Sequence, residues 1–183
     1  MSIDSDINKA ANILASASNT VVSSGAGMSA ESDIATFRDP GGIWDRLDPA
    51  SVGTTEGLIN MLSADAGALL PMFNELLDAF ADAAPNAGHI ALADMEKMGI
   101  LKTIITQNID NLHQEAGSTN VIEVHGNGFR LLCLACNYRQ DRKKGALIQE
   151  TKQKIASLTD YSLETLISVM PQCQKCGGIM RPD

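Results

Sequence analysis

Apolar residues near the start of the chain first follow helical spacing and then form a short continuous run. A helix is expected over residues 5–17, because its apolar side chains fall on one face. The β-branched run at 20–24 is typical of a strand, and it ends in the turn Gly25-Ala26-Gly27. Residues 29–32 can then open a helical turn. This arrangement cradles pyrophosphate in some proteins, although the same pattern also fits a plain tight turn.

The alternation of helix and strand continues through the middle of the chain. Residues 71–81 carry apolar residues at helical spacing, and Asn86 can cap a further helix. Residues 101–106 and 121–124 have the apolar, β-branched character of strands. Residues 39–69 are rich in small polar residues, which favours a loop with short helices that covers a ligand. Helices alternating with strands predict an α/β fold, in which helices cover both faces of a parallel sheet.

Polar residues follow both of these strands. Residues 107–113 come after the first strand, and His125 comes directly after the second. Because the carboxyl ends of parallel strands lie at the same edge of a sheet, we expect both segments beside the glycine-rich turn, in one crevice. Each also has a simpler interpretation: Asn108 and Asp110 as turn-forming residues, and His125 as a structural histidine.

Four cysteines lie in the last third of the chain as two C-x-x-C pairs. They are Cys133 with Cys136 and Cys173 with Cys176, and 36 residues separate the two pairs. Two such pairs assemble a tetrahedral thiolate site for structural zinc. Iron in the same cage and disulfide bonds are the alternatives. Four thiolates would leave no open coordination position for a substrate, so the metal is expected to be structural.

Charge divides the chain into two parts. The 183 residues carry a net charge of -8. Residues 1–129 hold 5 Lys and Arg against 17 Asp and Glu, a net charge of -12, whereas residues 130–183 hold 9 against 5, a net charge of +4. We therefore expect a separate module at 130–183. The acidic balance disfavours direct nucleic-acid binding, because neutralising phosphates requires clustered Lys and Arg.

Neither a membrane span nor a secretory signal is predicted. The chain has no run of about 18 apolar residues, and its N-terminus is acidic where a signal peptide would be basic. These features favour a cytoplasmic protein that does not bind membranes.

Taken together, the motifs resemble the sirtuins, a family of NAD-dependent protein deacylases with a Rossmann-like domain and a zinc-ribbon module. The resemblance runs in the family's order from about residue 9 to the end of the chain. It is carried by Gly25-Ala26-Gly27-Met28-Ser29-Ala30-Glu31-Ser32, Phe37-Arg38, Pro85-Asn86 with His89, Thr106-Gln107-Asn108-Ile109-Asp110-Asn111-Leu112-His113, Gly117-Ser118, His125-Gly126-Asn127, and the cysteine pairs ending in Arg181-Pro182-Asp183.

The resemblance implies a role for each of these segments. Residues 1–129 would form the NAD-binding Rossmann-like portion and 130–183 the zinc-binding module. His125 would be the general base and Asn108 a further catalytic residue. The residues implied to bind NAD are Gly25, Ala26, Gly27, Phe37, Arg38, Gln107, Asn108, Ile109 and Asp110, and those implied to bind zinc are Cys133, Cys136, Cys173 and Cys176.

The implied reaction removes an acyl group from a lysine of a protein substrate, passes it to ADP-ribose and releases nicotinamide. Transfer of ADP-ribose itself is an alternative, as is a non-catalytic zinc-bearing interaction module. Phe73 and Leu76 stand where family members that prefer acidic acyl groups carry Tyr and Arg, so that preference is not supported.

Two further features of the sequence differ from the family pattern. Asp33 stands where the family commonly has glycine; Asp tolerates left-handed backbone, but its carboxylate would repel a nearby phosphate. The family also continues beyond the Arg-Pro pair into the second half of its sheet. A fragment or a natural truncation is therefore expected, with an uncovered apolar sheet and little deacylase activity by itself.

Overall fold

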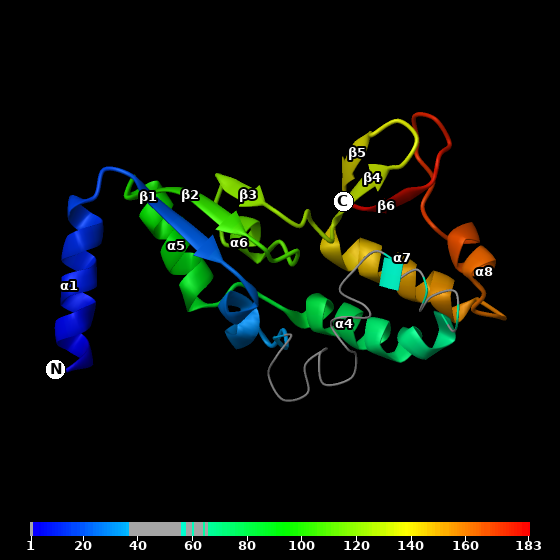
Figure 1. Cartoon of the computed structure of the whole chain (residues 1–183), viewed down its shortest axis with the longest axis horizontal. Helices are drawn as coiled ribbons and strands as arrows, with labels where there is room; N and C mark the ends of the chain where they lie inside the picture. The colour runs from blue at the N-terminus through cyan, green and yellow to red at the C-terminus, as the bar shows by residue number, and fades with distance from the viewer. Residues whose placement is uncertain (1, 37–55, 58–59, 61–63, 65) are drawn as a thin grey trace.

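The computed structural model describes every residue of the chain except 1, 37–55, 58–59, 61–63 and 65. The described chain has two halves that lie side by side, each built around a small sheet (Figure 1). One sheet is parallel, with β1 (Thr20–Ser24), β2 (Leu101–Thr106) and β3 (Val121–Glu123) in that order. The other is antiparallel, in the order β5 (Arg139–Asp141), β4 (Arg130–Cys133) and β6 (Met180–Pro182).

The register of the parallel sheet aligns the carboxyl ends of its three strands. Ser24 pairs with Thr106, and Thr106 pairs with Glu123. Backbone hydrogen bonds continue the alignment one residue further, from Gln107 N to Ser24 O and from Val124 N to Thr106 O. The predicted parallel sheet is thus confirmed. The loops that leave its three strands begin at one level along one edge.

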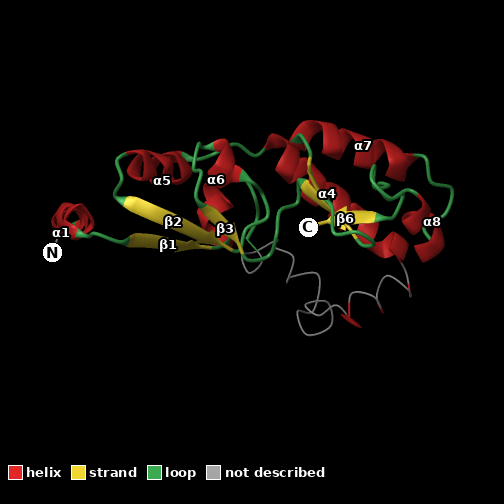
Figure 2. Cartoon of the chain, turned by 90° about the horizontal axis from the view of Figure 1, so that it is seen from above, coloured by secondary structure: helices red, strands yellow, loops and turns green. Residues whose placement is uncertain are grey.

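Helices α5 (Ala87–Lys97) and α6 (Leu112–Glu115) lie together on one side of the parallel sheet (Figure 2). Three apolar side chains of these elements, Leu101 and Ile104 of β2 and Leu112 of α6, are fully buried. Val21 and Ile122 remain exposed in the same sheet. Within the described residues, the hydrophobic packing of this half therefore lies mainly between α5, α6 and β2.

The three helices that the spacing of apolar residues predicts are confirmed, within a few residues at each end. They are α1 (Ile3–Ser16), α4 (Leu70–Asp82) and α5. Helix α1 stands at the far end of the molecule and buries none of its side chains (Figure 1). In α4, a proline occupies the first turn, where its missing N–H costs no helical hydrogen bond. No helix among the described residues is long and apolar enough to cross a membrane.

The second half has a hydrophobic core between α4, α7 (Lys144–Ala156) and the antiparallel sheet. Helix α8 (Leu163–Ser168) follows α7, and a short 3-10 turn, η3 (Ala66–Leu69), precedes α4. The buried residues of this core are Leu77, Phe80, Phe129, Leu131, Cys133, Leu147, Ile148, Cys173 and Met180. Two of them belong to α4, so this helix packs with the second half although it precedes residue 130 in the chain.

Candidate active site and metal centre

The glycine-rich turn leaves the carboxyl end of β1 with its outer surface open. Gly25 is extended, and it begins the 3-10 helix η1 (Ala26–Ser32). Among the residues that the structure describes, none places an atom within 4 Å of a Cβ atom built at Gly25 or at Gly27. The protein's own packing therefore does not require glycine at these two positions. The free space leaves the backbone accessible to a ligand, as a pyrophosphate-binding turn requires.

The loop after β2 is tied to this turn by side chains of the predicted site. Asn108 donates hydrogen bonds from Nδ2 to Gly25 O at 3.1 Å and to Ser29 Oγ at 3.0 Å. Ser29 in turn donates to Asp110 Oδ2 at 2.6 Å. Asp110 accepts a second bond, from Leu112 N to its other carboxylate oxygen at 3.0 Å. Protein donors thus contact both oxygens of this buried carboxylate, which holds the loop in shape.

Ser29 is a residue of this site that the sequence analysis did not single out. Its side chain is almost fully buried, and its hydroxyl both accepts from Asn108 and donates to Asp110. The available signal was a serine two residues after the second glycine of the turn. That signal alone does not distinguish a buried linker from an ordinary residue in the helical turn expected at 29–32.

Gln107 and Ile109 face different surroundings. Gln107 is exposed, beside the end of β1. Ile109 packs against the hydrophobic core of the second half, and its carbonyl accepts a hydrogen bond from Gly128 N at 2.9 Å. The loop after β2 therefore contacts both halves. Phe37 and Arg38, which the resemblance implies for NAD, lie outside the described residues.

The loop after β3 carries His125 and joins the loop after β2. Asn127 donates from Nδ2 to Asn111 Oδ1 at 2.8 Å, and its Oδ1 accepts from Phe129 N at 2.8 Å. His125 itself is exposed. The three loops therefore meet at one edge of the sheet, as the parallel register predicts, and the histidine is accessible to a substrate there.

A buried layer of polar side chains lies behind the glycine-rich turn. Asn86 caps α5 by accepting from Gly88 N and His89 N, and it donates from Nδ2 to Met28 O at 2.8 Å. The ring of His89 lies 4.8 Å from that of His113, whose Nε2 is 2.9 Å from Ser24 Oγ. Burial lowers the pKa of both histidines, so both rings are neutral at physiological pH.

Asp33 ends η1 in the left-handed conformation, with φ of 61°. This is the backbone for which glycine is favoured and which Asp tolerates better than most residues. Its side chain is exposed to solvent. Water and salt around an exposed carboxylate weaken the repulsion that it would exert on a phosphate.

The four cysteines come together as one cluster in the second half. Their sulfur atoms all lie within 4.8 Å of one another, with 3.6 Å between Cys133 and Cys176 and 3.7 Å between Cys136 and Cys173. A tetrahedral zinc with Zn–S bonds of about 2.3 Å places its sulfurs roughly 3.8 Å apart. The cluster therefore fits zinc. Sulfurs joined in a disulfide would be only about 2.05 Å apart.

Electrostatics within the cluster also favour a cation. Burial opposes ionisation of Cys133, but backbone N–H groups of Cys136 and Ala135 outweigh it and lower the pKa of Cys133 to about 6. At Cys136 the Tyr138 backbone favours the thiolate, yet the neighbouring Cys176 and burial raise the pKa of Cys136 to about 12. One thiolate thus suppresses ionisation of its neighbour. A divalent cation bound by both sulfurs would stabilise both thiolates at once.

A parallel sheet with three converging loops, joined to a cluster of four cysteines that fits zinc, defines a Rossmann-like α/β protein with a metal-binding module. The Sir2 family model matches residues 25–183. The chain therefore belongs to the Sir2 family.

Comparison with individual proteins agrees with this assignment. An NAD-dependent protein deacylase of Desulfosudis oleivorans is 55% identical over 183 residues, which cover 100% of this chain and 67% of that protein. One of Pyrococcus furiosus is 40% identical over 177 residues, covering 97% of this chain and 64% of that protein. The chain thus spans about two thirds of the length of these relatives.

Solved structures show the same fold. One is the structure of a Sir2 enzyme, solved to explain the mechanism and regulation of these enzymes. It has a TM-score of 0.65 at 37% identity, and the match covers 98% of this chain and 64% of that one. A Sir2 homologue in complex with ADP ribose has a TM-score of 0.66 at 31% identity, covering 95% of this chain and 61% of that one.

Proposed function

We propose that the chain forms the NAD-binding and metal-binding parts of a protein-lysine deacylase. The observation that carries this proposal is the convergence of three loops at the carboxyl edge of the parallel sheet. These are the open turn at Gly25, the loop of Asn108 and Asp110, and the turn of His125. The relatives in the Sir2 family are named NAD-dependent protein deacylases, which supports the same activity for this chain.

NAD would lie along this edge. When bound, it supplies a ribose carbon that is reactive because nicotinamide can leave from it. The backbone at Gly25 and Gly27 is open enough to receive the pyrophosphate. Asn108 is held by Gly25 O and Ser29, so its amide is oriented before the ligand arrives. Pre-orientation of this kind lowers the cost of bringing the reacting groups together.

His125 would accept a proton from a ribose hydroxyl. Its side chain is exposed at the edge where the three loops meet, while the other two histidines are buried behind the turn. Imidazole is the side chain best suited to exchange a proton near neutral pH. Of the three histidines, only His125 combines this chemistry with access to a substrate.

The zinc would hold the second half together without entering the reaction. All four cysteines are placed to bind one metal ion, so the coordination shell is complete without a substrate. Acylated lysine in proteins is the proposed substrate. A Sir2 structure with a deacetylated p53 peptide supports this class of substrate.

Nicotinamide release tests the proposal. The chain would be extended with the carboxyl-terminal third of the Desulfosudis oleivorans relative, which is 55% identical over the shared part. Release from NAD is expected only when an acetylated-lysine peptide is present. His125→Ala should lower the rate at which the deacetylated peptide forms by about 10²- to 10⁴-fold, the usual contribution of a general base. The unacetylated form of the same peptide is the control.

Two results would count against the proposal. Equal nicotinamide release with and without the acetylated peptide would indicate transfer of ADP-ribose to protein or water instead. Unchanged turnover in His125→Ala, with NAD binding intact, would show that another group accepts the proton.

A further inference from the structure

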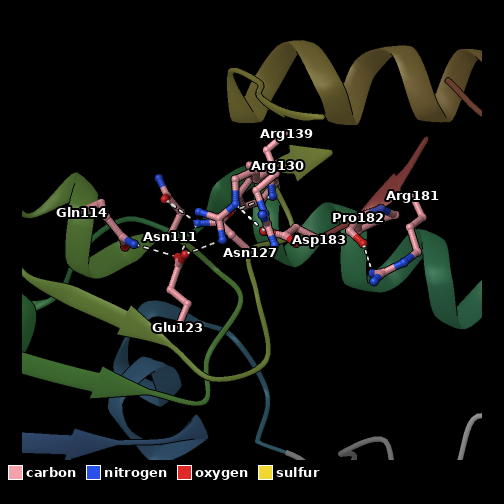
Figure 3. Close-up of polar contacts among 10 residues, drawn as sticks. Asn111, Gln114, Glu123, Asn127, Arg130, Arg139, Arg181, Pro182 and Asp183 are labelled. Atoms are coloured by element: carbon pink, nitrogen blue, oxygen red, sulfur yellow. Dashed lines mark hydrogen bonds and ion pairs between the residues drawn. The ribbon is translucent and has the colours of Figure 1, made fainter. Parts of the chain in front are cut away.

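Glu123 is a buried carboxylate that connects three segments of the chain. It is the last residue of β3, two positions before His125, and its side chain is only 8% exposed. Its Oε1 accepts from Gln114 at 2.7 Å and from Asn127 at 2.6 Å (Figure 3). Its Oε2 pairs with Arg130 at 2.9 Å. Three donors thus compensate the cost of burying this charge.

Arg130 extends the connection into the second half. Its guanidinium joins Glu123 to Asp183, with 2.5 Å between Nε and the Asp183 carboxylate (Figure 3). Arg139 contacts the same carboxylate at 3.1 Å. Burial opposes ionisation of Asp183, but hydrogen bonds from Arg130 and Arg139 outweigh it and lower the pKa of Asp183. The acid is therefore charged at neutral pH, and Arg130 lies between two carboxylates.

The antiparallel sheet connects these charges to the cysteine cluster. Arg130 begins β4, which ends at Cys133, and Asp183 follows β6. Asp183 N donates to Arg130 O at 2.8 Å, and Cys133 pairs with Met180 in the ladder. The two strands therefore run from the cysteines to the ion pairs.

The turn that carries His125 also touches the end of β6 directly. Gly126 has φ of +77°, and a Cβ atom there would lie 2.1 Å from the carbonyl oxygen of Asp183. Only glycine allows this approach of the two backbones. The turn is thus fixed on one side by Glu123 and on the other by the backbone of Asp183.

We propose that Arg130 is a positioning residue, which holds the His125 turn against the strands of the second half by bridging Glu123 and Asp183. The planar guanidinium can reach two carboxylates at once, whereas a lysine ammonium at this position would favour one of them. The inference rests on the proposed function only in taking His125 as the base. The bridge itself is a property of the fold.

Amide hydrogen exchange in the zinc-loaded chain tests the bridge without any activity. Arg130→Met removes both ion pairs and keeps most of the apolar stem. The reporters are Gly128 N, bonded to Ile109 O, and Phe129 N, bonded to Asn127 Oδ1. Their exchange should accelerate at least about tenfold, while the amides of α7 keep their protection and the zinc content is unchanged.

Arg142→Met is the matched control. Arg142 is 24% exposed, against 26% for Arg130, and it pairs with Glu150 within the second half. Its loss should leave exchange at Gly128 and Phe129 as in the unmodified chain. Equal exchange at these two amides in Arg130→Met and the unmodified chain would overturn the proposal, as would equal acceleration in both variants.

Two further variants keep the test decisive if Arg130→Met does not fold. Arg130→Lys retains the charge and should accelerate exchange less than the methionine variant. Asp183→Asn weakens the far end of the bridge and should accelerate exchange at Gly128 severalfold. No change in either folded variant would contradict a role for the bridge.

An activity arm separates positioning from simple stability. In the extended chain, Arg130→Met should lower kcat for nicotinamide release and leave the KM for NAD within about twofold, because the glycine-rich turn is untouched. A higher KM at unchanged kcat would contradict positioning of His125. If the unmodified extended chain releases no nicotinamide, the proposed function fails, whereas the exchange result still decides the role of Arg130.

Discussion

At the scale of single residues, Gly178 lets the two cysteine pairs close on each other. A Cβ atom there would lie 2.8 Å from Ala135 Cβ and 3.3 Å from the sulfurs of Cys133 and Cys176. Gly178→Ala should therefore force the pairs apart, at a cost of about 1–3 kcal/mol in unfolding free energy and with faster zinc release. Chemical denaturation and transfer of zinc to a coloured chelator measure the two effects.

Gly145 provides the control for this substitution. It lies in α7, and a Cβ atom there would meet nothing within 4 Å. Gly145→Ala should leave zinc release unchanged and raise stability by up to about 1 kcal/mol through helix propensity. If Gly178→Ala behaved like Gly145→Ala, the close contact around the sulfurs would be wrong.

The buried histidines make stability depend on pH. Burial lowers the pKa of His89 and His113 in the folded chain, so the unfolded chain binds more protons just below their ordinary value of 6.5. Their contribution is complete above that value and is lost as the pH falls toward the folded values. Urea unfolding should show decreasing stability between about pH 7 and pH 5.

Imidazole NMR signals assign that loss to the two rings. Both should keep the shifts of neutral rings to a lower pH than a free imidazole does, because burial lowers their pKa. Protonation of either ring at the same pH as a free imidazole, or at a higher pH, would contradict the effect of burial.

Residue-level features were predictable where chemistry is local. The left-handed tolerance of Asp33 and the metal-binding spacing of the cysteines follow from residue type and short spacing. The bridge of Arg130 was not predictable in this way, because its partner Asp183 lies 53 positions away and is set by strand pairing. Ser29 was missed because its role depends on Asp110, 81 positions away.

At the scale of elements, the cap of α5 also fastens η1 to the start of that helix. Asn86 accepts from two amides of the first helical turn and donates to Met28 O and to Ser32 Oγ. Asn86→Ala removes all four bonds. We expect a loss of about 2–3 kcal/mol, above the roughly 1 kcal/mol of an ordinary cap, because buried acceptors are left without their donor.

Ser162→Ala is the comparison variant. Ser162 caps the short helix α8 through one bond, to Thr165 N, at an exposed position. Its loss should cost at most about 1 kcal/mol. Thermal or urea unfolding of the two variants measures the difference. Equal losses would show that the bonds of Asn86 to η1 add nothing to the cap.

Elements with strong periodicity were predictable, and elements held by long-range contacts were not. The strands β1 to β3 and the helices α1, α4 and α5 follow from apolar spacing and capping residues. The strands of the antiparallel sheet are only three or four residues long, and they lie next to the cysteine pairs. Such strands are defined by pairing and by the cysteine cluster, which a local pattern does not reveal.

At the scale of the whole molecule, charged side chains connect the two halves at two places within the described part of the chain. One is the bridge of Arg130 between Glu123 and Asp183. The other is Lys144 at the start of α7, whose Nζ lies 2.9 Å from Ala83 O and 2.8 Å from Glu115. Together with the bond from Gly128 N to Ile109 O, these contacts set the position of the loops at the sheet edge.

The parallel register predicted that the loops after the three strands converge, and the contacts between Asn108, Gly25, Asn127 and Asn111 bear out that convergence. The packing of α4 with the second half was not apparent from charge. Net charge changes sign near residue 130 of the sequence, but the packing does not divide there. Helix α4 lies before that boundary and packs against α7, more than sixty residues later.

Whether these three loops form one site for NAD can be measured by mapping ADP-ribose binding with NMR on the isotope-labelled chain. For a single site, we expect the backbone amide shifts to change at residues 25–27, 107–110 and 125–127, and those of α7 and α8 to stay the same. Asn108→Ala should reduce the changes at all three loops together, because its amide joins the first two. Shift changes confined to one loop, or centred on the second half, would show that the three loops do not form one NAD site.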